Sequence, residues 1–182
     1  MAMIVADTDV LIDALHGKEP SAGRITLELA TGRLATTAIT VFELESGARG
    51  PKQRDQVQAL LAAMNLLPLN QKAAQRAAEI RRELEAKGQR IGTAAYPIAG
   101  IVLEHSGILL TRNRAHFERV PGLILGTEIC DSDQAFSPPG LALRSLEGGG
   151  CYSLCLARDG PGGYGQKAGT VALNLVSMDH EY

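Results

Sequence analysis

The side chains best suited to chemistry in this sequence are two acids and an amide that lie far apart in the chain, Asp7, Glu43 and Asn113. Asp7 and Asn113 follow short apolar runs that predict strands, and Glu43 lies near the start of a predicted helix. In open α/β sheets, ligands bind just beyond the carboxyl ends of the strands. Carboxylate and amide oxygens suit Mg²⁺ or Mn²⁺. Such a cation would join carboxylates that otherwise repel each other, activate a water and stabilise charge on a phosphodiester.

Two of these residues also have purely structural interpretations at helix starts. Asp7 could belong to a strand-to-helix turn in which Thr8 or Asp9 caps the helix. Glu43 lies three residues after Thr40, so the two could form only a capping box. The sequence leaves both alternatives open. Asp9 is a secondary candidate for the site because it lies so close to Asp7.

Other polar residues carry weaker signals. Asn113 lies between two arginines and could be only a turn residue. Asp13 is interpreted as a solvated acid on the first helix. His105 and His116 have no His, Cys or Asp partner at the spacing of a zinc site, so neither is expected to be a metal ligand.

Strands and helices alternate along the first part of the chain. The apolar run at residues 3–6 predicts a buried strand, and further short strands are expected at 33–37, 66–69, 108–111 and 123–125. Helices are expected after residue 8, from residue 21, and at about 40–48, 53–64, 70–87, 97–105 and 116–119. This alternation predicts an α/β fold, with a parallel sheet covered by helices on both faces.

Length and composition limit the class of protein. With 182 residues, of which 45% are hydrophobic, the chain suits one globular domain with an appendage. No apolar run approaches the roughly 18 residues of a membrane helix, and the start does not resemble a signal peptide, so a cytoplasmic location is expected. No glycine-rich phosphate loop follows the first strand, which argues against a nucleotide-binding domain.

The chain changes character near Leu125. Residues 1–125 hold 15 of the 18 Lys and Arg and 13 of the 20 Asp and Glu, whereas residues 126–182 hold 3 and 7. The second part also carries all three cysteines and 10 of the 20 glycines. We therefore predict a domain at 1–125 and a Gly/Pro-rich acidic extension at 126–182 that is poorly structured, with 170–176 as its one possible regular element. No zinc site is expected from the cysteines.

Four segments in order resemble the motifs of PIN-domain ribonucleases, and in particular the VapC-like and FitB-like toxins of bacterial type II toxin–antitoxin pairs. The resemblance covers about residues 3–125. The four segments are Asp7-Thr8-Asp9-Val10-Leu11-Ile12-Asp13, Ile39-Thr40-Val41-Phe42-Glu43-Leu44-Glu45-Ser46-Gly47-Ala48, Ile91-Gly92-Thr93-Ala94-Ala95-Tyr96-Pro97-Ile98-Ala99 and Leu109-Leu110-Thr111-Arg112-Asn113-Arg114-Ala115-His116-Phe117.

The resemblance implies a PIN-like three-layer fold around a five-stranded parallel sheet. It implies a metal-dependent endoribonuclease that forms a homodimer, cuts RNA and is inhibited by a cognate antitoxin protein. Asp7, Glu43 and Asn113 carry over as catalytic residues, with Asp7 and Glu43 as ligands of Mg²⁺ or Mn²⁺. Asn113 takes the fourth position of the motif set, which is more variable and where Asp or Asn is usual.

The third motif departs from the family, because its acidic residue, normally an Asp, falls at Ala95. The only oxygen donors near that position are Thr93 and Asp9, and inactivation is favoured over rescue by either. Tyr96-Pro97 is a second departure, since the residue before a proline avoids helical angles and the helix start could be displaced. Two hypotheses follow: a catalytically impaired ribonuclease toxin, or an inactive PIN-fold module that holds an antitoxin or RNA without cleaving.

Three arginines lie beside the predicted site, Arg112, Arg114 and Arg119. Such side chains bind phosphates, and we predict that they contact RNA. The alternative is an ordinary solvated surface, because residues 1–125 carry only a small excess of basic over acidic side chains.

Overall fold

The structure is a computed structural model, and it describes residues 2–127, 144–145 and 152–153. Its centre is a five-stranded, wholly parallel sheet in the order β3-β2-β1-β4-β5. The strands are β1 (Ile4–Ala6), β2 (Leu34–Thr37), β3 (Asn65–Leu67), β4 (Ile108–Leu110) and β5 (Ile124–Leu125). β1 is the central strand, so the residue that follows it, Asp7, lies at the middle of the sheet's carboxyl edge.

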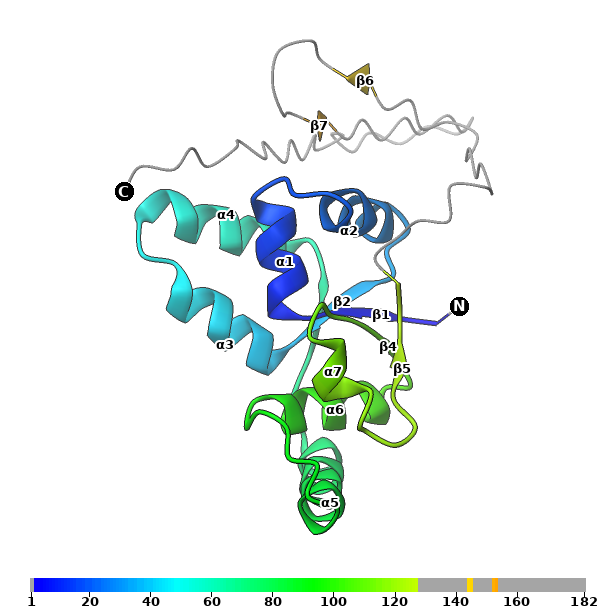
Figure 1. Cartoon of the computed structure of the whole chain (residues 1–182). Coiled ribbons are helices and arrows are strands. Elements are labelled where there is room, and N and C mark those ends of the chain that lie inside the picture. The colour runs from blue at the N-terminus through cyan, green and yellow to red at the C-terminus, as the bar shows by residue number, and fades with distance from the viewer. Residues whose placement is uncertain (1, 128–143, 146–151, 154–182) are drawn as a thin grey trace, which may run out of the picture. The chain divides into compact units, whose positions relative to one another are not determined.

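Helices cover both faces of this sheet, which confirms the predicted three-layer PIN-like architecture (Figure 1). Successive β1 residues serve opposite cores: Ile4 and Ala6 pack on one face, and Val5 packs on the other. The first face carries α1 (Thr8–Leu15), α2 (Ser21–Ala30), α3 (Ala38–Gly47) and α4 (Pro51–Ala62). The second carries α5 (Gln71–Ala86), α6 (Ala95–Glu104) and α7 (Arg114–Phe117).

The N-caps of two helices, α1 and α3, differ from the sequence prediction. The N-cap of α1 is Asp7 itself, whose side chain accepts from the Thr8 amide, so neither proposed alternative cap is used. Helix α3 begins at residue 38 and is capped by Thr37, whose hydroxyl accepts from the amide of Thr40. Thr40 therefore lies inside the helix, and the capping-box interpretation of Glu43 is wrong.

Helix α6 begins at Ala95, two residues before the expected start. Pro97 is consequently its third residue. The first amides of a helix have no intrahelical partner, so a proline there removes no hydrogen bond. The Tyr96-Pro97 pair therefore does not displace the helix start away from position 95, contrary to what the sequence suggested.

The part of the chain beyond the sheet is described only by two short strands, β6 (Arg144–Ser145) and β7 (Tyr152–Ser153), which pair antiparallel. The sequence did not predict them. The possible element at 170–176 and the predicted disorder of residues 128–182 otherwise fall outside the described residues. Within the described part, no helix has both the length and the apolar character needed to cross a bilayer.

The contact between α5 and α6 depends on a glycine. A Cβ atom on Gly100 would lie 2.4 Å from the carbonyl oxygen of Ala73 and 2.9 Å from the amide nitrogen of Ala77. Both atoms belong to the backbone of α5, so the helices would have to separate. We expect Gly100→Ala to lower the free energy of unfolding by about 1–3 kcal/mol in urea denaturation. Gly47→Ala, where nothing lies within 4 Å, is the control; equal stability of the two variants would contradict this packing.

Candidate active site

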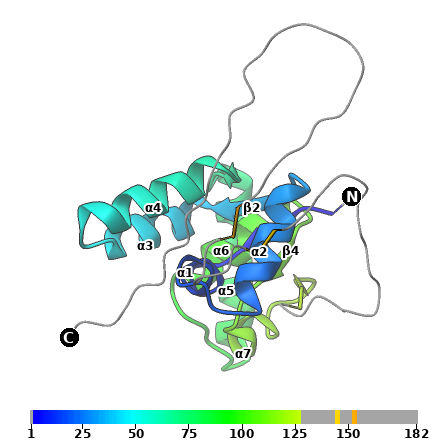
Figure 2. The same cartoon turned by 90° about the horizontal axis from the view of Figure 1, so that it is seen from above.

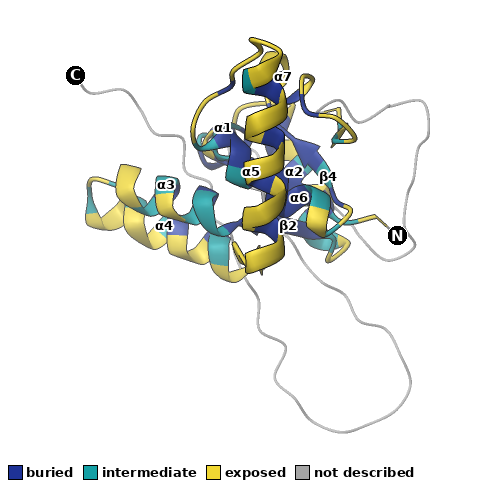
Figure 3. Ribbon diagram, turned by 90° about the horizontal axis from the view of Figure 1, so that it is seen from below, coloured by how far each residue is buried: buried dark blue, intermediate teal, exposed yellow. Residues whose placement is uncertain are grey.

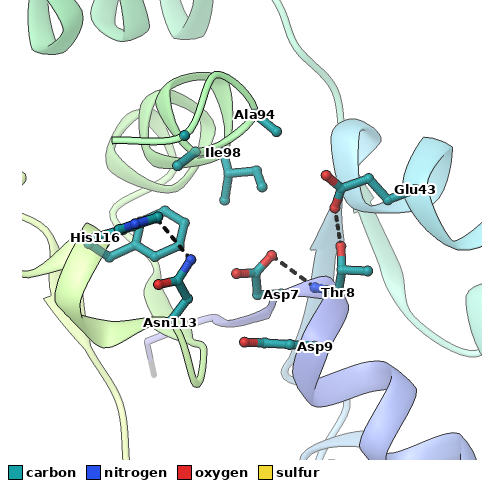
Figure 4. A pocket seen from close by; sticks show the side chains of 11 residues that line it. Asp7, Thr8, Asp9, Glu43, Ala94, Ile98, Asn113 and His116 are labelled. Carbon is teal, nitrogen blue, oxygen red and sulfur yellow. Dashed lines mark hydrogen bonds between the residues drawn. The ribbon is translucent and has the colours of Figure 1, made fainter. Parts of the chain in front are cut away.

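A cavity of about 260 Å³ opens at the carboxyl edge of the sheet, above the end of β1 (Figure 4). It brings together the predicted residues from three distant parts of the chain, with Asp7 between Glu43 on one side and Asn113 on the other. Its lining consists of Asp7, Thr8, Asp9, Glu43, Gly92, Ala94, Ala95, Ile98, Asn113, His116 and Phe117. Motifs that are far apart in the chain thus meet in one pocket, which has polar side chains and an apolar wall.

Asp7 is the buried acid of this cavity, with 7% of its surface exposed. One carboxylate oxygen accepts from the Thr8 amide at 2.8 Å, and the other accepts from the Thr111 hydroxyl at 2.8 Å. Burial raises the pKa of Asp7 to about 6, although these two hydrogen bonds oppose the shift. The nearby charges of Asp9 and Glu43 raise the pKa further. Ionisation of Asp7 is therefore more costly here than in water, and a bound positive charge would offset that cost.

Glu43 reaches the cavity from α3 and is half-buried. Its carboxylate accepts a hydrogen bond from the hydroxyl of Thr8, the first residue of α1. Thr8 therefore joins the two acids: its amide binds Asp7 and its hydroxyl binds Glu43 (Figure 4). This bridge fixes α3 against the start of α1.

Asp9 and Asn113 line the cavity but are also engaged by neighbours. The two oxygens of Asp9 accept from the amides of Val10 at 2.7 Å and Arg112 at 3.0 Å. The side-chain nitrogen of Asn113 lies 2.9 Å from Nδ1 of His116. Asp9 thus holds the turn that carries Asn113, which is a positional role in addition to the secondary role predicted for it.

Ala95 lies in the wall of the cavity and is 7% exposed. It is the first residue of α6, so a longer side chain there would start from the cavity wall. Of the two donors considered near this position, Thr93 is not among the lining residues, whereas Asp9 is. Asp9, the remaining candidate to replace the missing ligand, already accepts hydrogen bonds from two backbone amides.

The donor set of the cavity fits a hard divalent cation held with few protein ligands. Asp7 and Glu43 supply carboxylates and Asn113 a neutral amide, and Mg²⁺ is commonly bound by one or two carboxylates with several waters. Among the described residues, no three His, Cys, Asp or Glu side chains lie close enough to form a metal site. Position 95, where the family resemblance predicts an acid, lies in the wall of the same cavity.

The three arginines predicted to contact RNA lie outside the cavity lining and have protein partners. Arg112 forms an ion pair with Asp13, and Arg114 pairs with Glu118 at 3.2 Å. Arg119 donates to the backbone carbonyl of residue 90 at 3.2 Å. Asp13 is buried, and its hydrogen bonds to Arg112 and Lys18 outweigh burial and lower the pKa of its carboxyl. The interpretation of Asp13 as a solvated acid is therefore wrong.

Sequence reasoning missed three residues of the site: Thr8, Thr111 and His116. The two threonines donate to the acids Glu43 and Asp7, and each lies inside a quoted motif beside a predicted site residue. A hydroxyl next to a candidate acid was the available signal. No sequence signal pointed to His116, because its hydrogen bond to Asn113 requires the turn into α7 to be formed.

Comparisons with known proteins agree with this geometry. The sequence model of the family "PIN domain" matches residues 4–123. The tRNA(fMet)-specific endonuclease VapC of Shigella flexneri is 28% identical over 127 residues, covering 68% of this chain and 96% of that protein. Ribonuclease VapC2 of Rickettsia felis is 30% identical over 125 residues, covering 65% and 92%.

Solved structures give the same result. The Rickettsia felis VapBC2 complex bound to a promoter DNA fragment matches with a TM-score of 0.60 and 26% identity, over 68% of this chain and 97% of that one. DNA-bound VapBC from Salmonella typhimurium matches with a TM-score of 0.61 and 25% identity, over 71% and 100%. The chain is therefore a member of the PIN domain family, with VapC proteins among its relatives.

Proposed function

We propose that this chain is an endoribonuclease toxin of the VapC type, one partner of a toxin–antitoxin pair. The observation that carries the proposal is the convergence of Asp7, Glu43 and Asn113 on one cavity at the carboxyl edge of the sheet. Relatives named as ribonucleases, among them VapC2 of Rickettsia felis, support RNA as the substrate. The proposal is tested by incubating RNA with the purified chain and with Ala95→Asp, with Mg²⁺ or Mn²⁺ and with a chelator. No chelator-sensitive cleavage by either form would contradict it.

Asp7 and Glu43 are the proposed metal ligands, with Asn113 contributing a neutral oxygen. When bound, Mg²⁺ or Mn²⁺ supplies charge that activates a water and stabilises the phosphodiester during cleavage. The protein contributes orientation. Thr8 and Thr111 fix both oxygens of Asp7, and the Thr8 hydroxyl fixes Glu43, so neither carboxylate rotates freely.

Ala95 is the reason to propose that catalysis is impaired in this chain. The methyl group offers no oxygen to a cation. Asp7 and Glu43 are the carboxylates of the cavity left to hold one, because Asp9 accepts hydrogen bonds from two backbone amides. The alternative function is an inactive PIN-fold module that binds an antitoxin or RNA. Measuring RNA cleavage by the wild-type chain distinguishes the impaired ribonuclease from the inactive binding module, because only the ribonuclease would cleave.

The remaining expectations stay as proposals. An antitoxin partner is supported by the matches to toxin–antitoxin complexes, including that of Rickettsia felis. A homodimer is proposed from the family resemblance, and the cytoplasmic location remains the expectation drawn from the sequence. We keep the division into a nuclease domain at 1–125 and an acidic extension at 126–182. Arg112, Arg114 and Arg119 remain proposed RNA contacts at the edge of the site.

Metal affinity provides a direct test of position 95. We expect the chain as written to bind Mn²⁺ weakly and Ala95→Asp to bind at least about tenfold more tightly, because affinity rises with the number of charged ligands. Calorimetric titration of both forms measures the difference. Ala95→Asn, with the same size but no charge, is the control. Equal affinity of the Asp and Asn variants would mean that position 95 is not a ligand position.

A further inference from the structure

The pair of helices α3 and α4 extends away from the sheet as an arm, and its two helices run side by side in both views (Figures 1 and 2). We define the arm tip as residues 45–56. No residue of the arm tip is buried, and the buried residues of the two helices are Thr40, Leu44, Val57 and Leu60, outside the tip (Figure 3). One tip residue, Ala48, packs against the core as a partly buried side chain, whereas the charged side chains of the tip do not.

The arm tip carries Arg49, Lys52 and Arg54, all of them exposed. None of the three forms an ion pair with an acidic side chain in the described part of the chain. The two acids of the tip are Glu45 and Asp55, so the tip is basic overall.

Cations elsewhere in the domain are mostly compensated. Arg24 pairs with the buried Glu28 at 2.9 Å, Arg81 pairs with Glu85 at 3.0 Å, and the arginines beside the cavity bind protein groups. Cationic side chains without an acidic partner are thus concentrated at the arm tip, where none of them is buried. Solvated Lys and Arg of this kind are the groups that bind nucleic-acid phosphates and release counterions.

The arm tip is also held in a fixed relation to the cavity. Glu43 lies on α3, whose C-terminal end leads directly into the tip. At about 1.5 Å per residue, the end of α3 at Gly47 lies roughly 6 Å along the helix from Glu43, and Arg49 follows two residues later. The hydrogen bond from Thr8 to Glu43 ties this helix to the start of α1 at the cavity. A strand of RNA whose phosphate lies at the acids would therefore reach the tip within a short length.

We propose that the arm tip is a phosphate-binding surface that holds the backbone of single-stranded RNA next to the cavity. This inference rests on the proposed ribonuclease function and deepens it by naming where the substrate is held. The contact is electrostatic and independent of base identity, because the tip offers cations and no described pocket for a base. An acidic segment of a protein partner is the competing occupant, and in that case the arm variant would bind RNA as the wild type does.

The experiment uses the full chain and a fluorescein-labelled, 12-nucleotide RNA of mixed sequence, with a chelator present so that binding is measured without cleavage. The arm variant is Arg49→Gln/Lys52→Gln/Arg54→Gln. The matched control is Lys72→Gln/Arg82→Gln/Lys87→Gln, which removes three exposed cations from α5 and its C-cap; this helix packs on the other face of the sheet. Fluorescence anisotropy gives the dissociation constant at several salt concentrations.

We expect the arm variant to bind RNA at least about tenfold more weakly at 50 mM salt. The slope of log K against log salt concentration should be smaller in magnitude by about 2, because each phosphate contact contributes about 0.7 for single strands. The control should keep most of the wild-type slope. Because no substituted residue is buried, both variants should keep the wild-type melting temperature.

Two results would overturn the inference: an unchanged slope in the arm variant, or equal losses in the arm and control variants. These outcomes leave the ribonuclease function standing, because the wild-type chain still binds RNA in each. If the wild-type chain binds no RNA at any salt concentration, the proposed function itself fails, and the arm assignment falls with it.

Discussion

Ala95→Asp is expected to increase the rate of RNA cleavage by on the order of a hundredfold with Mg²⁺ or Mn²⁺ present. The expectation follows from positioning. With Asp7 and Glu43 alone a cation can shift in the cavity, and an error of about an ångström can lower a rate about a hundredfold. Asn113 is neutral and cannot replace the missing charge. Position 95 lies in the cavity wall at the first residue of α6, where the helix dipole also favours an acid.

The control for this experiment is Ala95→Asn, which adds the same volume without the charge. Both variants and the chain as written are incubated with total cellular RNA, with metal and with a chelator. Cleavage should rise only for the Asp variant, and only when metal is present. If the chain as written cleaves in a chelator-sensitive manner at the rate of the Asp variant, position 95 is not catalytic and the impairment is refuted.

Asp7→Asn is expected to stabilise the folded chain at neutral pH. The pKa of Asp7 rises from 3.8 to about 6 on folding, because burial disfavours its charged form. Folded protein therefore holds this proton more tightly than the unfolded chain does. The stability from protonated Asp7 is fully present below pH 3.8 and is lost as the pH rises through about 6. At 1.36 kcal/mol per pKa unit, the loss amounts to about 3 kcal/mol.

Asparagine suits this site because it keeps both hydrogen bonds. Its oxygen can accept from the Thr8 amide, and its nitrogen can donate to the Thr111 hydroxyl, which replaces the present contacts at 2.8 Å. Urea denaturation at pH 4.5 and 7.5 should show the variant gaining stability over the wild type mainly at the higher pH. Asp55→Asn, an exposed acid on α4, is the control. A stability gain that is the same at both pH values would show that charge burial at Asp7 is not its cause.

Sequence by itself determined the layout of the fold and predicted which polar side chains would lie together. Alternating apolar runs and helix patterns predict the parallel sheet, because strand and helix periodicities are local properties of the chain. The order of the motifs predicted that Asp7, Glu43 and Asn113 would meet, and the cavity contains all three. Ala95 could be recognised as a departure because its place in the third motif is fixed by neighbouring residues.

Local patterns were less reliable at element ends. Thr40 and Glu43 have the spacing of a capping box, but Thr37 caps the helix instead, since β2 already ends at that residue. Tyr96-Pro97 suggested a late helix start, yet α6 begins at Ala95 because a proline in the first turn loses no hydrogen bond. Both errors arise where two elements meet, and the packing of the neighbouring strand decides the boundary.

Tertiary structure alone decided the interactions that give the site its chemistry. Thr111 donates to Asp7 from 104 positions away, Thr8 donates to Glu43 across 35, and Arg112 binds Asp13 across 99. No local pattern encodes such contacts, because they form only when the carboxyl ends of β1, β2 and β4 lie side by side. Burial is likewise a property of the whole fold. It makes Asp7 a weak acid and leaves the charges of the arm tip uncompensated in solvent.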